Sequence, residues 1–128
     1  MKVQSFIIPK NAPTELYYQV DRGKAMYPKL HQHEEAQLSL IAKGSGLLFI
    51  NGAFVGYQPL DLIIIGSKVP HVFVSDTNST EAEMRSLYFN PQNLVGGLVE
   101  QDEVNDLITL FQKAQYGLKV NPKTHEEI

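Results

Sequence analysis

Short apolar stretches follow one another through the first ninety residues of the chain, and turn-forming residues separate them. They are rich in β-branched and aromatic residues and too short to form stable helices, so they predict β-strands. Eight strands at such close spacing predict a sandwich or a barrel. The expected strands are Val3–Ile8, Leu16–Val20, Gln37–Ala42, Gly46–Ile50, Ala53–Gln58, Leu62–Ile65, His71–Ser75 and Glu83–Phe89.

Asn51 and Gly52 stand between two of these apolar stretches and give the most specific local signal. An Asn-Gly pair readily adopts the positive φ angles of a two-residue hairpin turn. The sequence therefore predicts a tight hairpin between the strand before Asn51 and the strand after Gly52. Gly44 and Gly46, just before this hairpin, indicate a tight corner of the chain.

Beyond the last of these strands, apolar residues recur every three or four positions, which is the period of an amphipathic helix. This pattern predicts a helix of roughly Glu100–Tyr116 that ends at Gly117. Its apolar stripe either packs on the barrel or is buried against a second subunit. We therefore expect residues 1–90 to form the β-barrel and residues 91–128 to form C-terminal helices of the same domain that act as a dimerisation element. The stripe comprises Val104, Leu107, Ile108, Phe111 and Ala114.

Length and composition narrow the class of protein. A chain of 128 residues with 43% hydrophobic residues suits a single globular domain. Its net charge of -3 disfavours binding of a phosphate backbone by this chain, because such binding depends on clustered Lys and Arg. Cysteine is absent, which excludes disulfides and thiolate metal ligands. No apolar run approaches the roughly 20 residues of a membrane helix, so we expect a cytoplasmic protein that does not enter a membrane.

Two histidines, His31 and His33, precede the expected strand that begins at Gln37. On a continuous strand, alternate side chains point to the same side, so these histidines would share one polar face with Glu35, Gln37 and Ser39. Such a face either meets solvent or lines the interior of a barrel.

This segment resembles the first motif of the cupin superfamily, whose members are small all-β jelly-roll barrels. That motif reads G-x5-H-x-H-x3-4-E-x6-G, and it is matched at His31, His33 and Gly44. Gln37 stands in place of the glutamate, and Ala25 stands in place of the first glycine.

The second cupin motif, roughly G-D followed by P and then H, is matched by Asp61 and His71. Leu60 replaces its first glycine, and Gly66 and Lys68 replace the proline and the glycine of its internal P-x-G. The resemblance implies an all-β jelly-roll barrel (cupin) with a C-terminal helical segment, in which both motifs reach the interior.

In cupins that hold a metal, the positions of His31, His33, Gln37 and His71 supply the ligands. The resemblance therefore implies a candidate site for a divalent metal such as Zn, Fe, Ni or Mn. Gln37 offers a neutral amide oxygen in place of a carboxylate, which lowers the affinity for a cation. The alternative is that the same residues form hydrogen bonds with a small polar molecule.

Residues 27–120 resemble, more specifically, the N-terminal effector-sensing domain of AraC-type transcriptional regulators. This resemblance implies a small-molecule effector such as a sugar, a homodimer, and DNA binding only through a C-terminal domain that is not in this chain. Thr124 and Glu127 have the spacing of a capping box, as expected where a further helix begins. The matching residues are Tyr27-Pro28, His31-x-His33, Gln37-Leu38-Ser39-Leu40-Ile41, Gly44, Gly46, Asp61-Leu62, Ile65-Gly66, Pro70-His71, Tyr88-Phe89 and a helical stretch from Glu100 to Leu118.

The resemblance also suggests which side chains contact the effector. Phe49, Tyr57 or Tyr88 offers an aromatic face on which a sugar can stack, although packing in the core is the ordinary use of such residues. The candidate ligand-binding residues are His31, His33, Gln37, His71 and Tyr88.

A second class of function stays open, which is a small metal-dependent cupin enzyme such as a sugar isomerase or a dioxygenase. In such an enzyme the imidazoles position an ion that polarises the substrate or activates oxygen. The missing carboxylate argues against it, and Glu35 is the one nearby candidate for an acid or a base.

Overall fold

The computed structural model describes residues 3–9, 16–90 and 117–120, and within these ranges the regular structure consists of ten β-strands. The helix expected over residues 100–116 and the capping-box pattern near residue 124 lie outside the described residues. No helix within the described ranges has the length and apolar character needed to cross a membrane. The strands are β1 (Gln4–Phe6), β2 (Tyr17–Gly23), β3 (His31–His33), β4 (Ala36–Lys43), β5 (Gly46–Ile50), β6 (Ala53–Tyr57), β7 (Leu62–Ile65), β8 (His71–Ser75), β9 (Ala82–Phe89) and β10 (Gly117–Val120).

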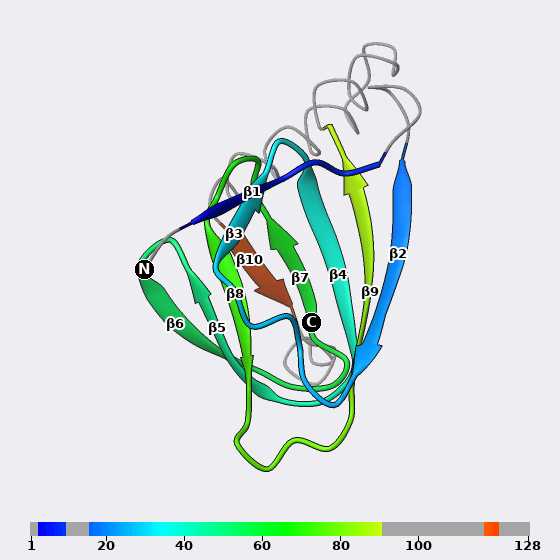
Figure 1. Cartoon of the computed structure of the whole chain (residues 1–128), viewed down its shortest axis with the longest axis vertical. Helices are drawn as coiled ribbons and strands as arrows, with labels where there is room; N and C mark the ends of the chain where they lie inside the picture. The colour runs from blue at the N-terminus through cyan, green and yellow to red at the C-terminus, as the bar shows by residue number, and fades with distance from the viewer. Residues whose placement is uncertain (1–2, 10–15, 91–116, 121–128) are drawn as a thin grey trace, which may run out of the picture.

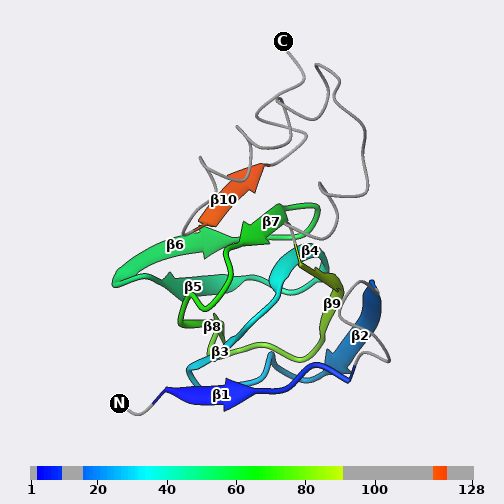
Figure 2. The same ribbon diagram turned by 90° about the horizontal axis from the view of Figure 1, so that it is seen from above.

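The strands form two five-stranded sheets that face each other (Figure 2). One sheet has the order β1-β3-β8-β5-β6 and the other has the order β10-β7-β4-β9-β2. Consecutive strands therefore often belong to different sheets, which is consistent with the expected cupin jelly roll. β1 runs across the open end of the layers and pairs in parallel with β3 (Figure 1).

The expected strands agree closely with the observed ones. β5, β7 and β8 have the predicted bounds, and the other predicted strands differ by one to three residues at an end. The hairpin between β5 and β6 is confirmed, because Ile50 pairs with Ala53 and the two turn residues have φ angles of 48° at Asn51 and 81° at Gly52.

The interpretation of residues 31–39 as one continuous strand was wrong. The chain bends at Glu34 and Glu35, so that β3 lies in the first sheet and β4 in the second. A closed two-sheet fold needs strands that cross between its layers, and alternation of polar side chains does not reveal where the crossing occurs. β10 was also not predicted, since its four residues follow directly on the helical pattern.

Apolar side chains fill much of the space between the sheets. This core includes the fully buried residues Ile41, Ile63 and Ile65, which come from the neighbouring strands β4 and β7 of the second sheet. Burial of such side chains contributes about 1.5–3 kcal/mol each, so this cluster supplies much of the stability of the barrel. The end of the barrel that β1 crosses holds the candidate site.

Leu60 and Lys68 adopt left-handed backbone conformations, with φ angles of 75° and 60°. These are the two positions at which the second cupin motif has glycine, the residue that adopts such angles without steric cost. The chain therefore keeps the backbone shape of the motif although the glycines have been replaced, and it carries local strain at both turns.

Leu60→Gly is expected to increase the free energy of unfolding by about 0.5–1 kcal/mol, because relief of the left-handed strain exceeds the entropic cost of a glycine. Little burial is lost, since Leu60 is 51% exposed. Urea denaturation monitored by circular dichroism measures the change. Leu47→Gly is the matched control, because Leu47 is 48% exposed on β5 with an ordinary φ angle, and this substitution should be destabilising. A Leu60→Gly protein less stable than the wild type would contradict the strain argument.

Candidate functional site

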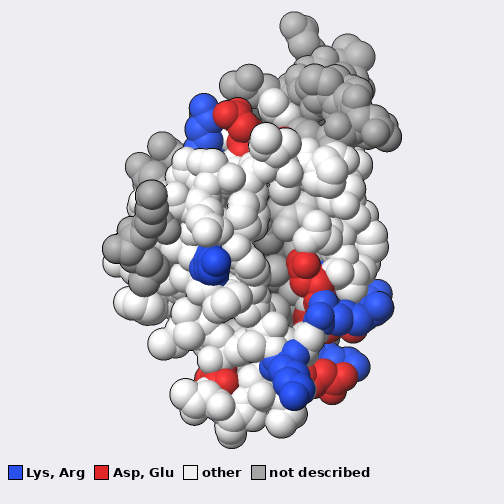
Figure 3. All heavy atoms as spheres, viewed as in Figure 1, with Lys and Arg blue, Asp and Glu red and all other residues white. Residues whose placement is uncertain are grey.

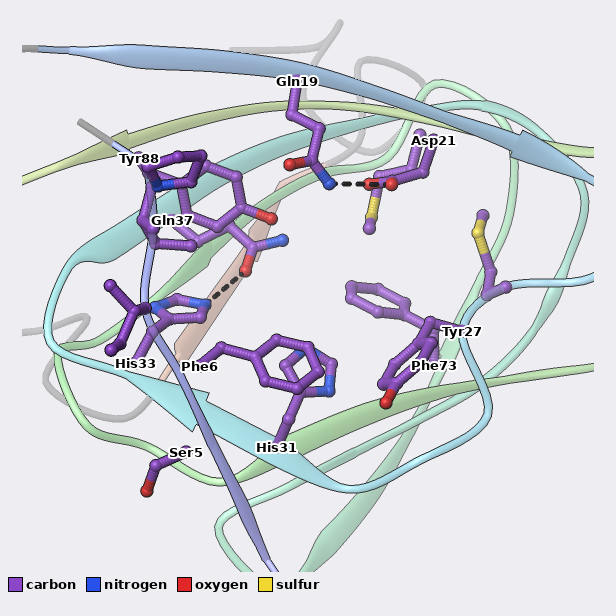
Figure 4. Close-up of a pocket in the computed structure, with 15 residues that line it drawn as sticks. Ser5, Phe6, Gln19, Asp21, Tyr27, His31, His33, Gln37, Phe73 and Tyr88 are labelled. Carbon is purple, nitrogen blue, oxygen red and sulfur yellow. Dashed lines mark hydrogen bonds between the residues drawn. The ribbon is translucent and has the colours of Figure 1, made fainter. Parts of the chain in front are cut away.

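A cavity of about 500 Å³ opens between the two sheets at the end crossed by β1. Side chains from β1, β2, β3, β4, β8 and β9 line it, so it is formed by segments distant in sequence (Figure 4). Its polar lining includes Gln19, Asp21, His31, His33 and Gln37. A volume of this size accommodates a small organic molecule.

Three imidazoles meet at the inner wall of this cavity. His31 on β3 lies directly opposite His71 on β8, and their ring centroids are 4.3 Å apart. The ring of His33 lies 5.2 Å from that of His71. The candidate ligand atoms of the three residues all lie within 4.8 Å of one another. Histidines from two distant segments thus converge, as the resemblance to the cupin motifs implied.

Each of the three rings is held by its own backbone segment. Nδ1 of His31, His33 and His71 lies 2.8 Å from the carbonyl oxygens of Lys29, Glu35 and Val69, respectively. A carbonyl oxygen only accepts hydrogen bonds, so in each pair Nδ1–H is the donor. In a neutral ring this assignment leaves Nε2 unprotonated, with its lone pair free to accept a hydrogen bond or bind a metal.

Burial keeps two of these rings uncharged at neutral pH. Desolvation, together with the neighbouring His31, lowers the pKa of His71 to about 3. Desolvation also lowers the pKa of His31. His71 is completely buried, and its Nε2 has no hydrogen-bond partner within the described part of the chain. An unpaired buried acceptor costs about 1–3 kcal/mol of stability. Such an acceptor is typical of a site where a ligand or an ion supplies the missing contact.

Gln37 joins His33 to a polar network behind the cavity wall. Its Oε1 is placed 3.0 Å from His33 Nε2, and its Nε2 lies 2.7 Å from the Ser39 hydroxyl, which lies 2.7 Å from that of Ser86. In a neutral His33 ring Nε2 carries no proton, so it can only accept a hydrogen bond from Gln37. The Gln37 amide must therefore be reversed, so that its N–H group donates to His33 Nε2 and its oxygen accepts from the Ser39 hydroxyl. The Gln37 amide is therefore engaged with its neighbours.

The imidazole cluster fits a divalent metal in its donor atoms. Three neutral histidines whose Nδ1–H groups donate to carbonyl oxygens form the arrangement that commonly supports bound Zn, Fe, Ni or Mn. His31, His33 and His71 would hold such an ion. Gln37, the fourth expected ligand, offers no negative charge and would have to give up its contact with His33.

The structure separates the candidate aromatic residues. Tyr88 lines the cavity, and its ring lies 5.1 Å from that of His33. Phe49 packs against Phe54, with centroids 4.9 Å apart, and does not line the cavity. Tyr57 is buried in the core against Phe73 and does not line the cavity either. Packing was therefore the correct interpretation for Phe49 and Tyr57.

The polar candidates fall into two layers. His31, His33 and Gln37 line the cavity directly, whereas His71 lies behind His31 and reaches the cavity only through the cluster. Glu35 is buried and does not line the cavity.

Several lining residues were not predicted. Gln19 and Asp21 stand on the same face of β2, and their alternation along an expected strand was a usable signal. Phe6, from β1, stacks on His31 with centroids 4.8 Å apart, and Tyr27 meets the edge of the same ring at 5.4 Å. The parallel pairing of β1 with β3, which places Phe6 there, has no local signature in the sequence.

The two-sheet barrel with a polar cavity at one end defines a cupin-like ligand-binding domain. Residues 12–114 match the AraC-like ligand binding domain family, and the chain belongs to that family. Members of this family are regulatory rather than enzymatic and bind small-molecule effectors.

Among the solved structures that resemble this chain, ToxT agrees with this assignment at the level of the fold. ToxT from Vibrio cholerae, solved with an unsaturated fatty acid bound, aligns with a TM-score of 0.55 and 12% identity over 89% of this chain and 43% of ToxT. An RmlC-like cupin from Shewanella frigidimarina NCIMB 400 aligns with a TM-score of 0.47 and 21% identity over 58% of this chain and 65% of the cupin. The plu4264 protein from Photorhabdus luminescens aligns with a TM-score of 0.46 and 18% identity over 81% of this chain and 77% of plu4264. The chain thus spans less than half of ToxT, and no curated protein matches it.

Proposed function

We propose that this domain senses a small polar effector, of the carbohydrate class, on behalf of an AraC-type transcriptional regulator in the cytoplasm. The observation that carries the proposal is the convergence of His31, His33 and Gln37 on the wall of a 500 Å³ cavity. His31 Nε2 offers a hydrogen-bond acceptor in a desolvated setting, and His33 and Gln37, which bond to each other, form the polar wall beside it. A hydroxyl group of a sugar can donate to this acceptor.

Tyr88 complements the polar wall in this proposal. Its ring offers an apolar face at the cavity surface, next to His33. A pyranose presents C–H groups on one face and hydroxyls at its edges, so it can contact Tyr88 and the imidazoles together. The Nε2 of His71 accepts a hydrogen bond once the effector or an ordered water reaches it.

The fatty acid bound to ToxT suggests another ligand chemistry, but the described lining of this cavity suits it less well. A fatty acid carries a carboxylate, and no Lys or Arg lies among the described lining residues. A buried carboxylate without a cationic partner is costly. The proposal therefore favours a ligand rich in hydroxyl groups.

The proposed output is a change in how two subunits pair. Residues 91–128 are proposed to belong to the same domain as the barrel and to act in dimerisation, and the pairing of Gly117–Val120 (β10) with β7 supports the assignment to one domain. DNA is proposed to be read by a further domain that is not in this chain. The effector would bias the equilibrium only if it binds one pairing state more tightly than the other.

A panel of monosaccharides tests the proposal by thermal unfolding in the presence of a chelator. A sugar present at 100 times its Kd should add about 2.7 kcal/mol to the free energy of unfolding. His31→Ala removes a lining acceptor and should abolish this gain, whereas Phe54→Ala, at a 64% exposed residue outside the cavity, should retain it. If no sugar stabilises the protein, or if His31→Ala responds like the wild type, the assignment of the cavity to carbohydrate fails.

The imidazole cluster supports a second candidate, a metal-dependent cupin enzyme. A metal held by His31, His33 and His71 would act as a Lewis acid toward a bound substrate. Metal analysis of protein purified without chelator separates the candidates. Near-stoichiometric Fe, Ni or Mn favours the enzyme, whereas metal-free protein that a sugar stabilises favours the sensor.

A further inference from the structure

Asp21 gives the cavity a distinct electrostatic character. It is the one acidic residue among the described residues that line the cavity, and no Lys or Arg lines it there. Within the described ranges, Asp21 has no ion-pair partner, although other carboxylates such as Glu83 and Glu81 are paired with Arg or Lys. The lining thus carries a negative charge that the described protein groups do not balance.

The contact between Gln19 and Asp21 fixes which atoms face the cavity. Nε2 of Gln19 donates to Oδ1 of Asp21 over 2.8 Å. An ionised carboxylate only accepts hydrogen bonds, so the amide nitrogen must face it and the amide oxygen of Gln19 must point elsewhere. In Figure 4 that oxygen points away from Asp21, toward the side of Tyr88. This end of the cavity therefore presents a charged acceptor, Asp21, beside the Gln19 amide.

Aromatic rings line the cavity opposite this acceptor group. Tyr27 and Phe73 lie across the open centre from Asp21, and the ring of Phe6 lies 5.4 Å from that of Tyr27 (Figure 4). The negative face of an aromatic ring attracts a cation, most strongly where water is excluded. Figure 3 shows that charged side chains on this side of the molecule gather mainly toward its lower end and that most of the remaining surface is uncharged.

We propose that the effector carries a protonated amine, which is bound between the Asp21 carboxylate and the rings of Tyr27 and Phe73. The ligand class is thus an ammonium-bearing polyol, with the amine at the β2 wall and the hydroxyls at the imidazole wall. The inference of a polyol rests on the proposed function, whereas the inference of an amine rests on Asp21, Gln19 and the aromatic rings. The same charge excludes carboxylate ligands.

The carboxylate of Asp21 acts across the cavity as well as locally. Burial and, as a smaller cause, the nearby Asp21 raise the pKa of Tyr88 to about 12. Asp21 also raises the pKa of His31, against the larger lowering effect of burial. Both walls therefore experience the negative charge of Asp21.

Three sugars that differ in one charged group test this proposal, namely glucosamine, glucose and glucuronate. Each is titrated at pH 7 into the full chain with chelator present, and the ring NMR signals of His31 and Tyr88 are followed. We expect glucosamine to bind about tenfold more tightly than glucose, since a charge-assisted hydrogen bond supplies this factor, and glucuronate to bind most weakly.

Asp21→Asn keeps the shape of the side chain and removes its charge. The preference for glucosamine over glucose should fall to within about twofold in this variant. Glu81→Gln is the matched control, because it removes one negative charge from an exposed side chain outside the cavity and should leave the preference unchanged. The ranking of the three sugars in the wild type tests the charge even if Asp21→Asn does not fold.

The outcomes separate the two proposals. Equal binding of glucose and glucosamine, or tighter binding of glucuronate, overturns the amine site and leaves a carbohydrate sensor standing. Choline, which has the charge without a sugar ring, is the fourth probe. Saturable shifts with choline that vanish in Asp21→Asn, without any response to glucose, would support the amine site and overturn the carbohydrate assignment. No saturation with any of the four probes overturns both.

Discussion

Acidification from pH 7 to pH 4 is expected to lower the free energy of unfolding of the metal-free protein by about 2–3 kcal/mol through His71 alone. Burial holds the pKa of folded His71 at about 3, far below its ordinary value. At a pH between the folded pKa of about 3 and the ordinary pKa of 6.5, the imidazole binds a proton in the unfolded chain and not in the folded chain, so stability falls as the pH falls. The contribution is fully present above the unfolded pKa of about 6.5 and decreases down to about pH 3.

Urea denaturation across this pH range, with chelator present, measures the effect. The matched variant is His71→Asn, whose amide can still donate to the Val69 carbonyl oxygen but does not titrate. The difference in stability between wild type and variant should change by about 2–3 kcal/mol from pH 7 to pH 4, because the other titrating groups are shared. Parallel pH profiles for the two proteins would mean that His71 is not buried in a neutral form.

Gly46→Ala is expected to lower the free energy of unfolding by about 3 kcal/mol, which reduces Tm by on the order of 10 °C. A Cβ at this position would overlap the carbonyl oxygen of Val74 and lie 3.0 Å from Cα of Ser75. Both atoms belong to the backbone of the neighbouring β8, so they cannot move aside as a flexible side chain would. The strand pair β5–β8 must separate locally to admit the methyl group.

Gly56→Ala provides the control for this effect. Gly56 lies on the adjacent strand β6, and a Cβ there meets nothing within 4 Å. The substitution restricts the unfolded chain and should leave stability unchanged or raise it by about 0.5 kcal/mol. Thermal unfolding of the two variants side by side measures both. A Gly46→Ala protein as stable as the Gly56→Ala protein would contradict the close approach of β5 and β8.

Local sequence signals predicted most of the strands, because strand length, β-branched content and turn residues are properties of a short window. The Asn51-Gly52 turn is the clearest case, since its φ angles follow from the residues themselves. The crossing of the chain between sheets at Glu34 and Glu35 was not predictable in this way. It depends on closure of the whole barrel, which no short window records.

The substituted glycines of the second motif show where family resemblance added information. Leu60 and Lys68 have no intrinsic preference for positive φ, so propensity alone gives no reason to expect left-handed turns there. Alignment with the cupin motif placed both residues at glycine positions, and the structure has positive φ at each. The tertiary fold has thus retained a backbone geometry that its local sequence opposes.

The candidate site was predictable in part. The H-x-H pattern and His71 indicated one inner wall of the barrel, because both follow from motif spacing. The opposite wall, formed by Gln19 and Asp21 on β2 and by Phe6 on β1, depends on pairings between strands far apart in sequence. The absence of Lys and Arg from the described lining was likewise evident only once the cavity was assembled.

The central claim is that His31 and His71 present unprotonated Nε2 atoms to one ligand-binding interior. Nitrogen NMR of the imidazole rings at pH 7, in metal-free and ligand-free protein, tests this most directly. The account predicts Nδ1 protonated and Nε2 unprotonated in His31 and His71, with no titration of His71 between pH 8 and pH 4. A charged His71, or a ring with its proton on Nε2, would contradict the account, because the interior would then offer a donor where an acceptor is required.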